Sequence, residues 1–145
     1  MATLSEARIK GRGNKEARLL IVDDFPKEEG QRVFDDPAAR FLIRQIFREA
    51  GVELEDVFAT YAVDRRPYTK KTNETSKKVT IGNVRDCRDQ LYKTIKKIKP
   101  RVVIALGDAP LHGLLPIYKS KDGDDEKKSS GVTGSLTWRG HCAGS

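Results

Sequence analysis

Residues 19–26 read LLIVDDFP, a short apolar run that ends in two carboxylates, an aromatic ring and a proline. The run is too short for a buried helix and is rich in residues that favour a strand. Pro26 has no N–H to donate to a sheet, so the strand is expected to end there. Open α/β sheets place their chemistry at the carboxyl ends of parallel strands, which makes Asp23 and Asp24 the first candidates for a catalytic site. The alternative is that both are solvated turn residues.

The rest of the chain alternates between strand and helix. Asp36 can cap a helix that begins at Pro37, and Gly51 suits its exit. The predicted elements are a strand at 17–23, a helix at 37–50, a strand at 57–63, a helix from Asn83 to Ile98, a strand at 102–106, a short helix at 109–115 that Pro116 ends, and a last strand at 135–140. This alternation predicts a three-layer α/β/α domain with a short parallel sheet and right-handed crossovers.

Three stretches lack such periodicity. Residues 1–16 are predicted to be a flexible basic arm ahead of a domain at 17–145. Residues 68–80 are predicted to be a mobile polar loop, and residues 119–134 a disordered excursion. Cys87 lies on the apolar stripe of the second helix, so it is interpreted as a small core residue. The strand at 102–106 is apolar on both faces and is expected to be central in the sheet.

Length and composition limit the class of protein. The chain has 145 residues and 37% hydrophobic residues, which suits one globular domain with its own core. No apolar run is long enough to span a bilayer and the polar N-terminus is no secretory signal, so no membrane partner is expected. Two cysteines make no disulfide framework, which favours a reducing, cytoplasmic location such as the nucleoid or a host cytoplasm.

The formal charge is +7 and unevenly distributed. Residues 64–101 hold thirteen Lys or Arg against four Asp or Glu, an excess of nine. Such a stripe attracts polyanions, so DNA, contacted through its phosphates, is the expected partner. The alternative is a solvated charged face. The DNA-binding candidates are Arg65, Arg66, Lys70, Lys71, Lys77, Lys78, Arg85, Arg88 and Arg139.

Several short motifs, in order and spacing, resemble the uracil-DNA glycosylase superfamily. Its nearest branches are the family that carries an iron–sulfur cluster and the related domains of phage DNA polymerases. The segments that carry the resemblance are IVDDFP at 21–26, VF at 33–34, AGV at 50–52, DVFATYAV at 56–63, RP at 66–67, IKPRVVIALG at 98–107 and LTWRG at 136–140. The resemblance implies an α/β fold and a site that handles an extruded base.

The departures from the family's motifs concern its chemistry. Asp24 stands where the resemblance places a catalytic Glu, and Asp23 and Lys27 replace two glycines. Tyr61 replaces the asparagine that reads the uracil edge. By the same resemblance Asp24 or Asp23 supplies the carboxylate that stabilises a cationic sugar or orients water, and Phe25 stacks on a base in a pocket with Tyr61.

The cluster ligands are also missing. Of the four cysteines that the resemblance implies, only Cys87 has a counterpart, and Arg65 stands at the position of another. No cofactor is therefore expected, and the protein is predicted to be colourless and iron-free. His112 and His141 lack the setting of the family's histidine, whose His-Pro-Ser segment would fall beyond Ser145. The two histidines and two cysteines also lack the spacing of a zinc site.

Three functions remain open. The first is a DNA-binding domain of the glycosylase type with a degenerate site, expected in a phage-type DNA polymerase or another replication or repair protein. The second is an active uracil-DNA glycosylase that uses Asp24. The third is a protein-interaction module in replication or repair. In each case the domain is expected to be incomplete at its C-terminus and to need a larger parent chain or a partner.

Overall fold

A computed structural model describes residues 3–119. Its main sheet has four strands in the order β2-β4-β3-β6. The strands are β2 (Arg12–Gly13), β3 (Leu19–Asp23), β4 (Val57–Tyr61) and β6 (Val102–Ala105). β3 pairs in parallel with β4 on one side and with β6 on the other, and β2 closes the β4 side antiparallel. The predicted parallel sheet is confirmed, and the run at 19–23 is one of its two central strands.

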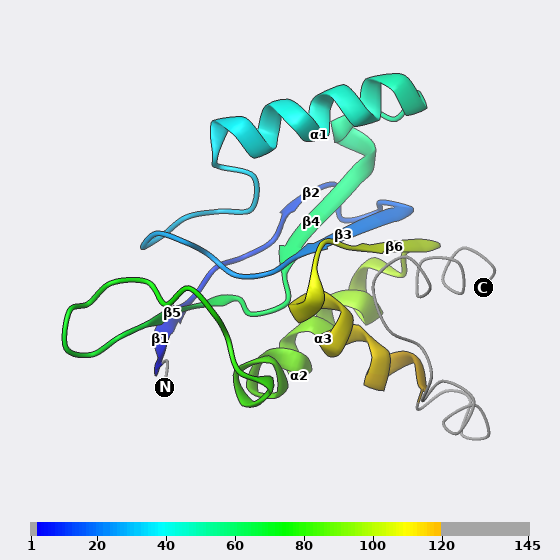
Figure 1. Ribbon diagram of the computed structural model, residues 1–145. Helices are drawn as coiled ribbons and strands as arrows, with labels where there is room; N and C mark the ends of the chain where they lie inside the picture. Colours follow the sequence, from blue (N-terminus) through cyan, green and yellow to red (C-terminus); the bar gives the residue numbers. More distant parts are fainter. Residues whose placement is uncertain (1–2, 120–145) are drawn as a thin grey trace.

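Helices cover both faces of this sheet (Figure 1). α1 (Pro37–Ala50) lies on one face, and α2 (Ile81–Ile98) and α3 (Asp108–Lys119) lie on the other. A 3-10 turn, η1 (Leu54–Asp56), leads from α1 into β4. The predicted three-layer α/β/α architecture is therefore confirmed. No helix within residues 3–119 is both long and apolar enough to cross a membrane.

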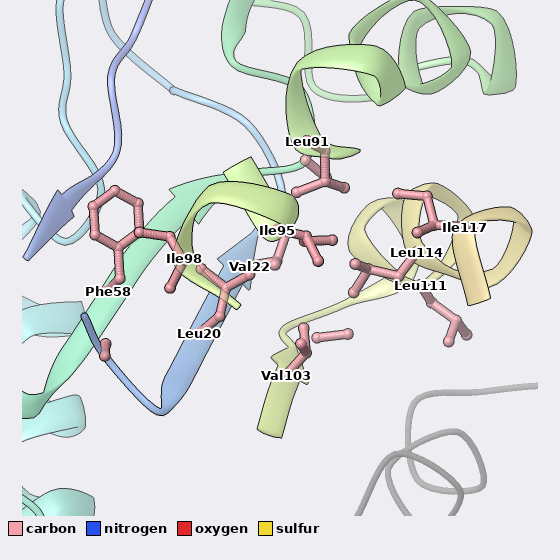
Figure 2. Close-up of a cluster of buried hydrophobic side chains, with 13 residues drawn as sticks. Leu20, Val22, Phe58, Leu91, Ile95, Ile98, Val103, Leu111, Leu114 and Ile117 are labelled. Carbon is pink, nitrogen blue, oxygen red and sulfur yellow. The ribbon is translucent and has the colours of Figure 1, made fainter. Parts of the chain in front are cut away.

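Alternate residues of the strands feed two cores. Leu20 and Val22 point to the α2 and α3 side, whereas Ile21 points to the α1 side. Figure 2 shows the larger cluster, in which side chains of α2 and α3 pack on β3 and β6. The stripe predicted for the second helix is buried over its whole length, and Cys87 is a core residue as expected.

α1 begins and ends where the sequence predicts. The Asp36 carboxylate accepts from the Ala39 N–H, Pro37 opens the helix, and Gly51 ends it in the left-handed conformation at φ 71°. For α2 the prediction of a start at Asn83 is wrong, because Thr80 is the cap. The Thr80 hydroxyl accepts from the Asn83 N–H, and the Asn83 side chain accepts from the Thr80 N–H. This capping box adds two residues to the helix.

The N-terminal segment is the largest departure from expectation. Thr3–Arg8 forms strand β1, which pairs antiparallel with β5 (Arg65–Tyr68) in a separate two-stranded sheet. The Arg8 guanidinium donates to the buried Asp64 carboxylate at 2.7 Å and 3.0 Å, so a charge pair anchors this segment together with Leu4, which packs against the cluster that holds Val63. The expected flexible arm is therefore ordered over the residues described.

Two elements near residue 110 also differ from expectation. β6 is an edge strand among the described residues rather than a central one, because β3 is its only neighbour there. α3 continues through Pro116. A proline inside a helix leaves the carbonyl four residues earlier without its N–H partner. That carbonyl belongs to His112, and the Arg88 guanidinium of α2 donates to it at 3.2 Å. The predicted excursion at 119–134 and last strand at 135–140 lie outside the described residues, apart from Lys119, which ends α3.

Candidate functional site

The turn after β3 is shaped by its own carboxylates. The Asp24 N–H donates to Asp23 Oδ1 at 2.8 Å, and the Phe25 N–H donates to Asp24 Oδ1 at 2.7 Å. Backbone pairing continues past the strand, since the Ala62 and Val63 N–H groups donate to the carbonyls of these two aspartates. Asp23 is therefore the last residue of β3 and Asp24 the first residue after it, and both are held in fixed positions at the carboxyl edge of the sheet instead of being freely solvated turn residues.

The two aspartates belong to different sides of the sheet. The side chain of Asp23 points to the same face of the sheet as that of Ile21, because the two are two residues apart on one strand. Asp23 pairs in register with Tyr61 of β4, and this face is the one that α1 covers. Burial raises the pKa of Asp23 to about 6, and the neighbouring Asp24 charge adds to that rise. Burial also raises the pKa of Tyr61, and the charge of Asp23 raises it further. Tyr61 is 4% exposed and packs in the core below α1.

Asp24 and Phe25 face the other side, where they line a cavity of about 500 Å³. The cavity lies at the carboxyl ends of β3 and β6 and between the first turns of α2 and α3. Its lining comprises Asp24, Phe25, Lys78, Val79, Thr80, Ile81, Val84, Asp108, Ala109 and His112. The structure thus brings Asp24 and Phe25 together but separates them from Tyr61.

The charge of Asp24 is partly compensated within the turn. Asp24 Oδ2 forms an ion pair with Lys27 Nζ at 2.9 Å. The same ammonium lies 3.3 Å from the centroid of the Phe25 ring, which is a cation–π contact. Phe25 is only 5% exposed and packs with Val63 and Val84, so the expected stacking of a base on its ring is wrong, and a ligand in the cavity would meet the ammonium and the carboxylate.

The cavity also has features that favour negative charge. The first turns of α2 and α3 both line it, and helix N-termini carry partial positive charge. Lys78 adds a full positive charge at the rim, against which Asp108 adds a negative one. His112 supplies a hydrogen-bonding imidazole on the wall formed by α3. Sequence reasoning gave His112 no role. The spacing could have indicated it, because His112 lies one helical turn after Asp108, the first residue of the helix that follows β6.

The basic residues fall into two groups. Lys70, Lys71, Lys77, Lys78 and Arg85 are exposed, as expected for a surface that meets phosphates. The arginines are mostly engaged within the protein. Arg65 donates to the carbonyls of Ser5 and Leu4 and so attaches β1. Arg88 holds the His112 carbonyl. Arg66 is buried against the loop that follows β5, and Arg139 lies outside the described residues.

The residues near Cys87 do not fit an iron–sulfur cluster. Cys87 is buried among Phe25, Val63 and Val84, and burial raises the pKa of its thiol to about 11. A cluster needs several thiolates. The position that resembles a second ligand is Arg65, whose guanidinium is bound to β1 carbonyls. Within residues 3–119 no group of three or more His, Cys, Asp or Glu side chains is placed to hold a metal ion.

Comparison with known proteins gives a consistent result. A family model described as the uracil DNA glycosylase superfamily matches residues 10–138. A type-4 uracil-DNA glycosylase of Thermotoga maritima is 29% identical over 105 residues, covering 71% of this chain and 52% of the relative. One of Saccharolobus solfataricus is 30% identical over 103 residues, covering 68% of this chain and 44% of the relative. The chain thus spans about half the length of these relatives.

Proposed function

Because the chain belongs to the uracil-DNA glycosylase superfamily, we propose that it is a DNA-binding domain that excises uracil slowly or not at all. The observation that carries this proposal is the cavity at the carboxyl edge of the sheet, with Asp24 and Phe25 on one wall and Lys78 at its rim. Nucleotides offer a matching feature, a phosphate that binds ammonium groups at the rim. Phe25 is 5% exposed and packs in a core cluster, so it forms part of the cavity wall and does not present a free ring face to a base.

The binding surface extends from this cavity. Lys77 and Lys78 lead into α2, and Lys70 and Lys71 lie on the same loop, all four exposed. A basic surface of this kind binds a nucleic-acid backbone with little preference for sequence. We expect contacts to single- or double-stranded DNA mainly through phosphates. The larger protein in which such a domain acts is proposed to be a phage-type DNA polymerase or another replication or repair protein, working in the nucleoid or the host cytoplasm.

Weak or absent excision is proposed from the residues around the base. Tyr61 stands at the position of the uracil-reading asparagine and is buried below α1, on the opposite side of the sheet from the cavity. It is therefore not available to read a base held there. The ion pair between Asp24 and Lys27 also lowers the carboxylate's capacity to stabilise a cationic sugar.

A binding and excision experiment tests this proposal. Affinity for a labelled 20-nucleotide single strand, with thymine or with one deoxyuridine, is measured as NaCl is raised. We expect the logarithm of affinity to fall linearly with the logarithm of salt, by roughly 0.7 per phosphate neutralised. Alkali treatment after incubation reports excised uracil, and we expect little. Absence of any salt-dependent binding would contradict the proposal.

An active glycosylase is the second candidate, and one observation favours it. Asp24 and His112 line the same cavity, so a carboxylate and a hydrogen-bond donor for a departing base are both present. In this case excision would be efficient and would fall steeply in both Asp24→Ala and His112→Ala. Asp36→Ala, which removes a carboxylate far from the cavity, would be the matched control.

A protein-interaction module is the third candidate, favoured by the outer face of α1. Phe41, Leu42 and Ile46 are 66%, 59% and 52% exposed, which is unusual for large apolar side chains close together on one helix. Arg44 and Arg48 are exposed beside them. An amphipathic acidic segment of a replication or repair protein would complement this face. Phe41→Ser with Ile46→Ser would abolish such an interaction and leave DNA binding unchanged.

A further inference from the structure

The loop between β5 and α2 is ordered by a single buried arginine. Arg66 is 8% exposed, and its guanidinium reaches across the loop. Nη1 donates to the Asn73 carbonyl at 3.3 Å and to Thr75 Oγ1 at 3.0 Å, and Nη2 donates to Asn73 Oδ1 at 3.1 Å. Three hydrogen bonds from one planar group therefore fix the far side of a loop that the sequence predicts to be mobile.

The backbone of the loop closes on itself around this contact. The Thr69 N–H donates to the Glu74 carbonyl at 2.9 Å and the Asn73 N–H to the Thr69 carbonyl at 2.7 Å. Tyr68 and Thr75 form an antiparallel bridge. Asn73 adopts a left-handed backbone at φ 58°, a conformation that asparagine tolerates better than most residues. The loop is thus a defined turn with its tip held on β5.

This arrangement has an energetic cost. No carboxylate of residues 3–119 lies within ion-pair distance of Arg66, and its Nε has no partner there. A guanidinium that is buried without a carboxylate costs free energy, which its hydrogen bonds to the loop and its contact with the Tyr68 ring, 5.2 Å from Cζ to the ring centroid, have to offset. The loop carries the exposed Lys70 and Lys71 and continues through Lys77 to Lys78 at the rim of the cavity.

We propose that Arg66 is a positioning residue that holds this lysine-bearing loop as a preformed phosphate-binding element beside the cavity. The inference rests on the proposed DNA-binding function and adds to it. It reassigns Arg66 from direct contact with DNA to support of the residues that make that contact. Ordering a loop in advance removes part of the entropy that binding would otherwise lose, so affinity rises without any new phosphate contact.

Affinity and its salt dependence separate the two roles. A lysine that binds a phosphate contributes to the slope of log affinity against log salt, by roughly 0.7 for single-stranded DNA. A residue that only positions the lysines changes the affinity and leaves the slope as it is. Arg66→Lys keeps the positive charge and removes the planar fork of donors. Asn73→Gly keeps the left-handed backbone and removes only the side-chain acceptor.

The experiment measures anisotropy of a labelled oligothymidylate of 20 nucleotides between 50 and 300 mM NaCl. We expect Arg66→Lys and Asn73→Gly to weaken binding by roughly 3- to 10-fold with an unchanged slope. The double variant Lys70→Gln, Lys71→Gln should lower the slope by roughly 1.4. The double variant Lys96→Gln, Lys97→Gln removes the same two charges from the last turn of α2 and is the control. It should change the affinity and the slope only slightly.

Trypsin cleavage at Lys70 and Lys71 gives a readout that does not depend on DNA. It should be slow in the parent protein and faster in Arg66→Lys and Asn73→Gly, with circular dichroism showing that both remain folded. If the parent protein shows no salt-dependent binding, the proposed function itself fails. If it binds, but the Lys70 and Lys71 double variant behaves like the Lys96 and Lys97 double variant, only the loop inference fails. A lower slope in Arg66→Lys and Asn73→Gly would also overturn it, because the loop would then not be acting through position alone.

Discussion

Replacing Asp23 by asparagine should make the stability of the protein less dependent on pH. Burial raises the pKa of Asp23 from its ordinary 3.8 to about 6, and the Asp24 charge adds to this. The folded state therefore binds this proton more tightly than the unfolded state does. The contribution of the Asp23 proton to the free energy of unfolding is fully present below about pH 4 and is lost as pH rises through about 6. Asparagine keeps an oxygen for the Asp24 N–H, which lies 2.8 Å from Asp23 Oδ1.

The size of the effect follows from the two pKa values. The difference between 3.8 and about 6 corresponds to about 3 kcal/mol, at about 1.36 kcal/mol per pH unit. An asparagine amide also loses hydration in this position, but that cost does not depend on pH. Because the unfolded carboxyl is already partly ionised at pH 4, the free-energy difference between Asp23→Asn and the parent should grow in favour of the variant by about 2 kcal/mol from pH 4 to pH 7.5.

Urea unfolding followed by circular dichroism at pH 4, 5, 6 and 7.5 measures this difference. Asp35→Asn is an informative control, because its carboxylate accepts from the Arg32 N–H and faces Arg12, and these contacts lower the pKa of Asp35. The Asp35 carboxylate stabilises the folded state above the unfolded pKa, and this stabilisation is lost as pH falls. Its effect on stability therefore changes with pH in the opposite direction to that of Asp23. Parallel stability curves for Asp23→Asn and the parent would refute the reasoning.

Three further predictions concern packing and the buried thiol. Gly13→Ala should destabilise the β2–β4 pair by about 1–3 kcal/mol, since φ is 121° there and a Cβ would meet the Val57 carbonyl oxygen at 2.2 Å; thermal unfolding measures this. Leu114→Ala should cost about 2–5 kcal/mol in urea unfolding, because Leu114 is 0% exposed in the main core. With Cys142 changed to serine, Cys87 should react with a thiol reagent at pH 8 far more slowly when folded than when unfolded, since burial raises its pKa to about 11. Rapid reaction of the folded protein would contradict that burial.

The fold was predictable where local signals agreed with the global pattern. The strand at 19–23 is a continuous apolar run followed by a proline, and the helix from Pro37 has apolar residues at helical spacing and a capping residue at each end. Both lie where expected. The strand pair β1–β5 escaped prediction because most of its residues are polar, with no alternating apolar pattern, and because an ion pair over 56 residues, Arg8 with Asp64, anchors it. Contacts over that separation leave no periodic signal in a sequence.

The site was predictable in part for a similar reason. Strand ends identify edge residues, and this rule located Asp24 and Phe25 at the cavity. The family resemblance grouped Tyr61 with Phe25 in one base pocket, and the structure contradicts this, because the Tyr61 side chain lies on the α1 side of the sheet. The positive charge of a residue does not show whether its side chain is exposed and free to contact DNA. The lysines of the stripe are on the surface, whereas Arg66 is buried and holds a loop.

The most direct test of the proposed DNA-binding surface is the map of amide chemical shifts in ¹⁵N-labelled protein titrated with a single strand that contains one deoxyuridine. We predict the largest changes in the turn at 24–27, the loop at 70–78, and the first turns of α2 and α3, which surround the cavity. Amides of α1, on the other side of the sheet, should stay unchanged. Shifts centred on α1, or no shifts at DNA concentrations well above that of the protein, would contradict the account.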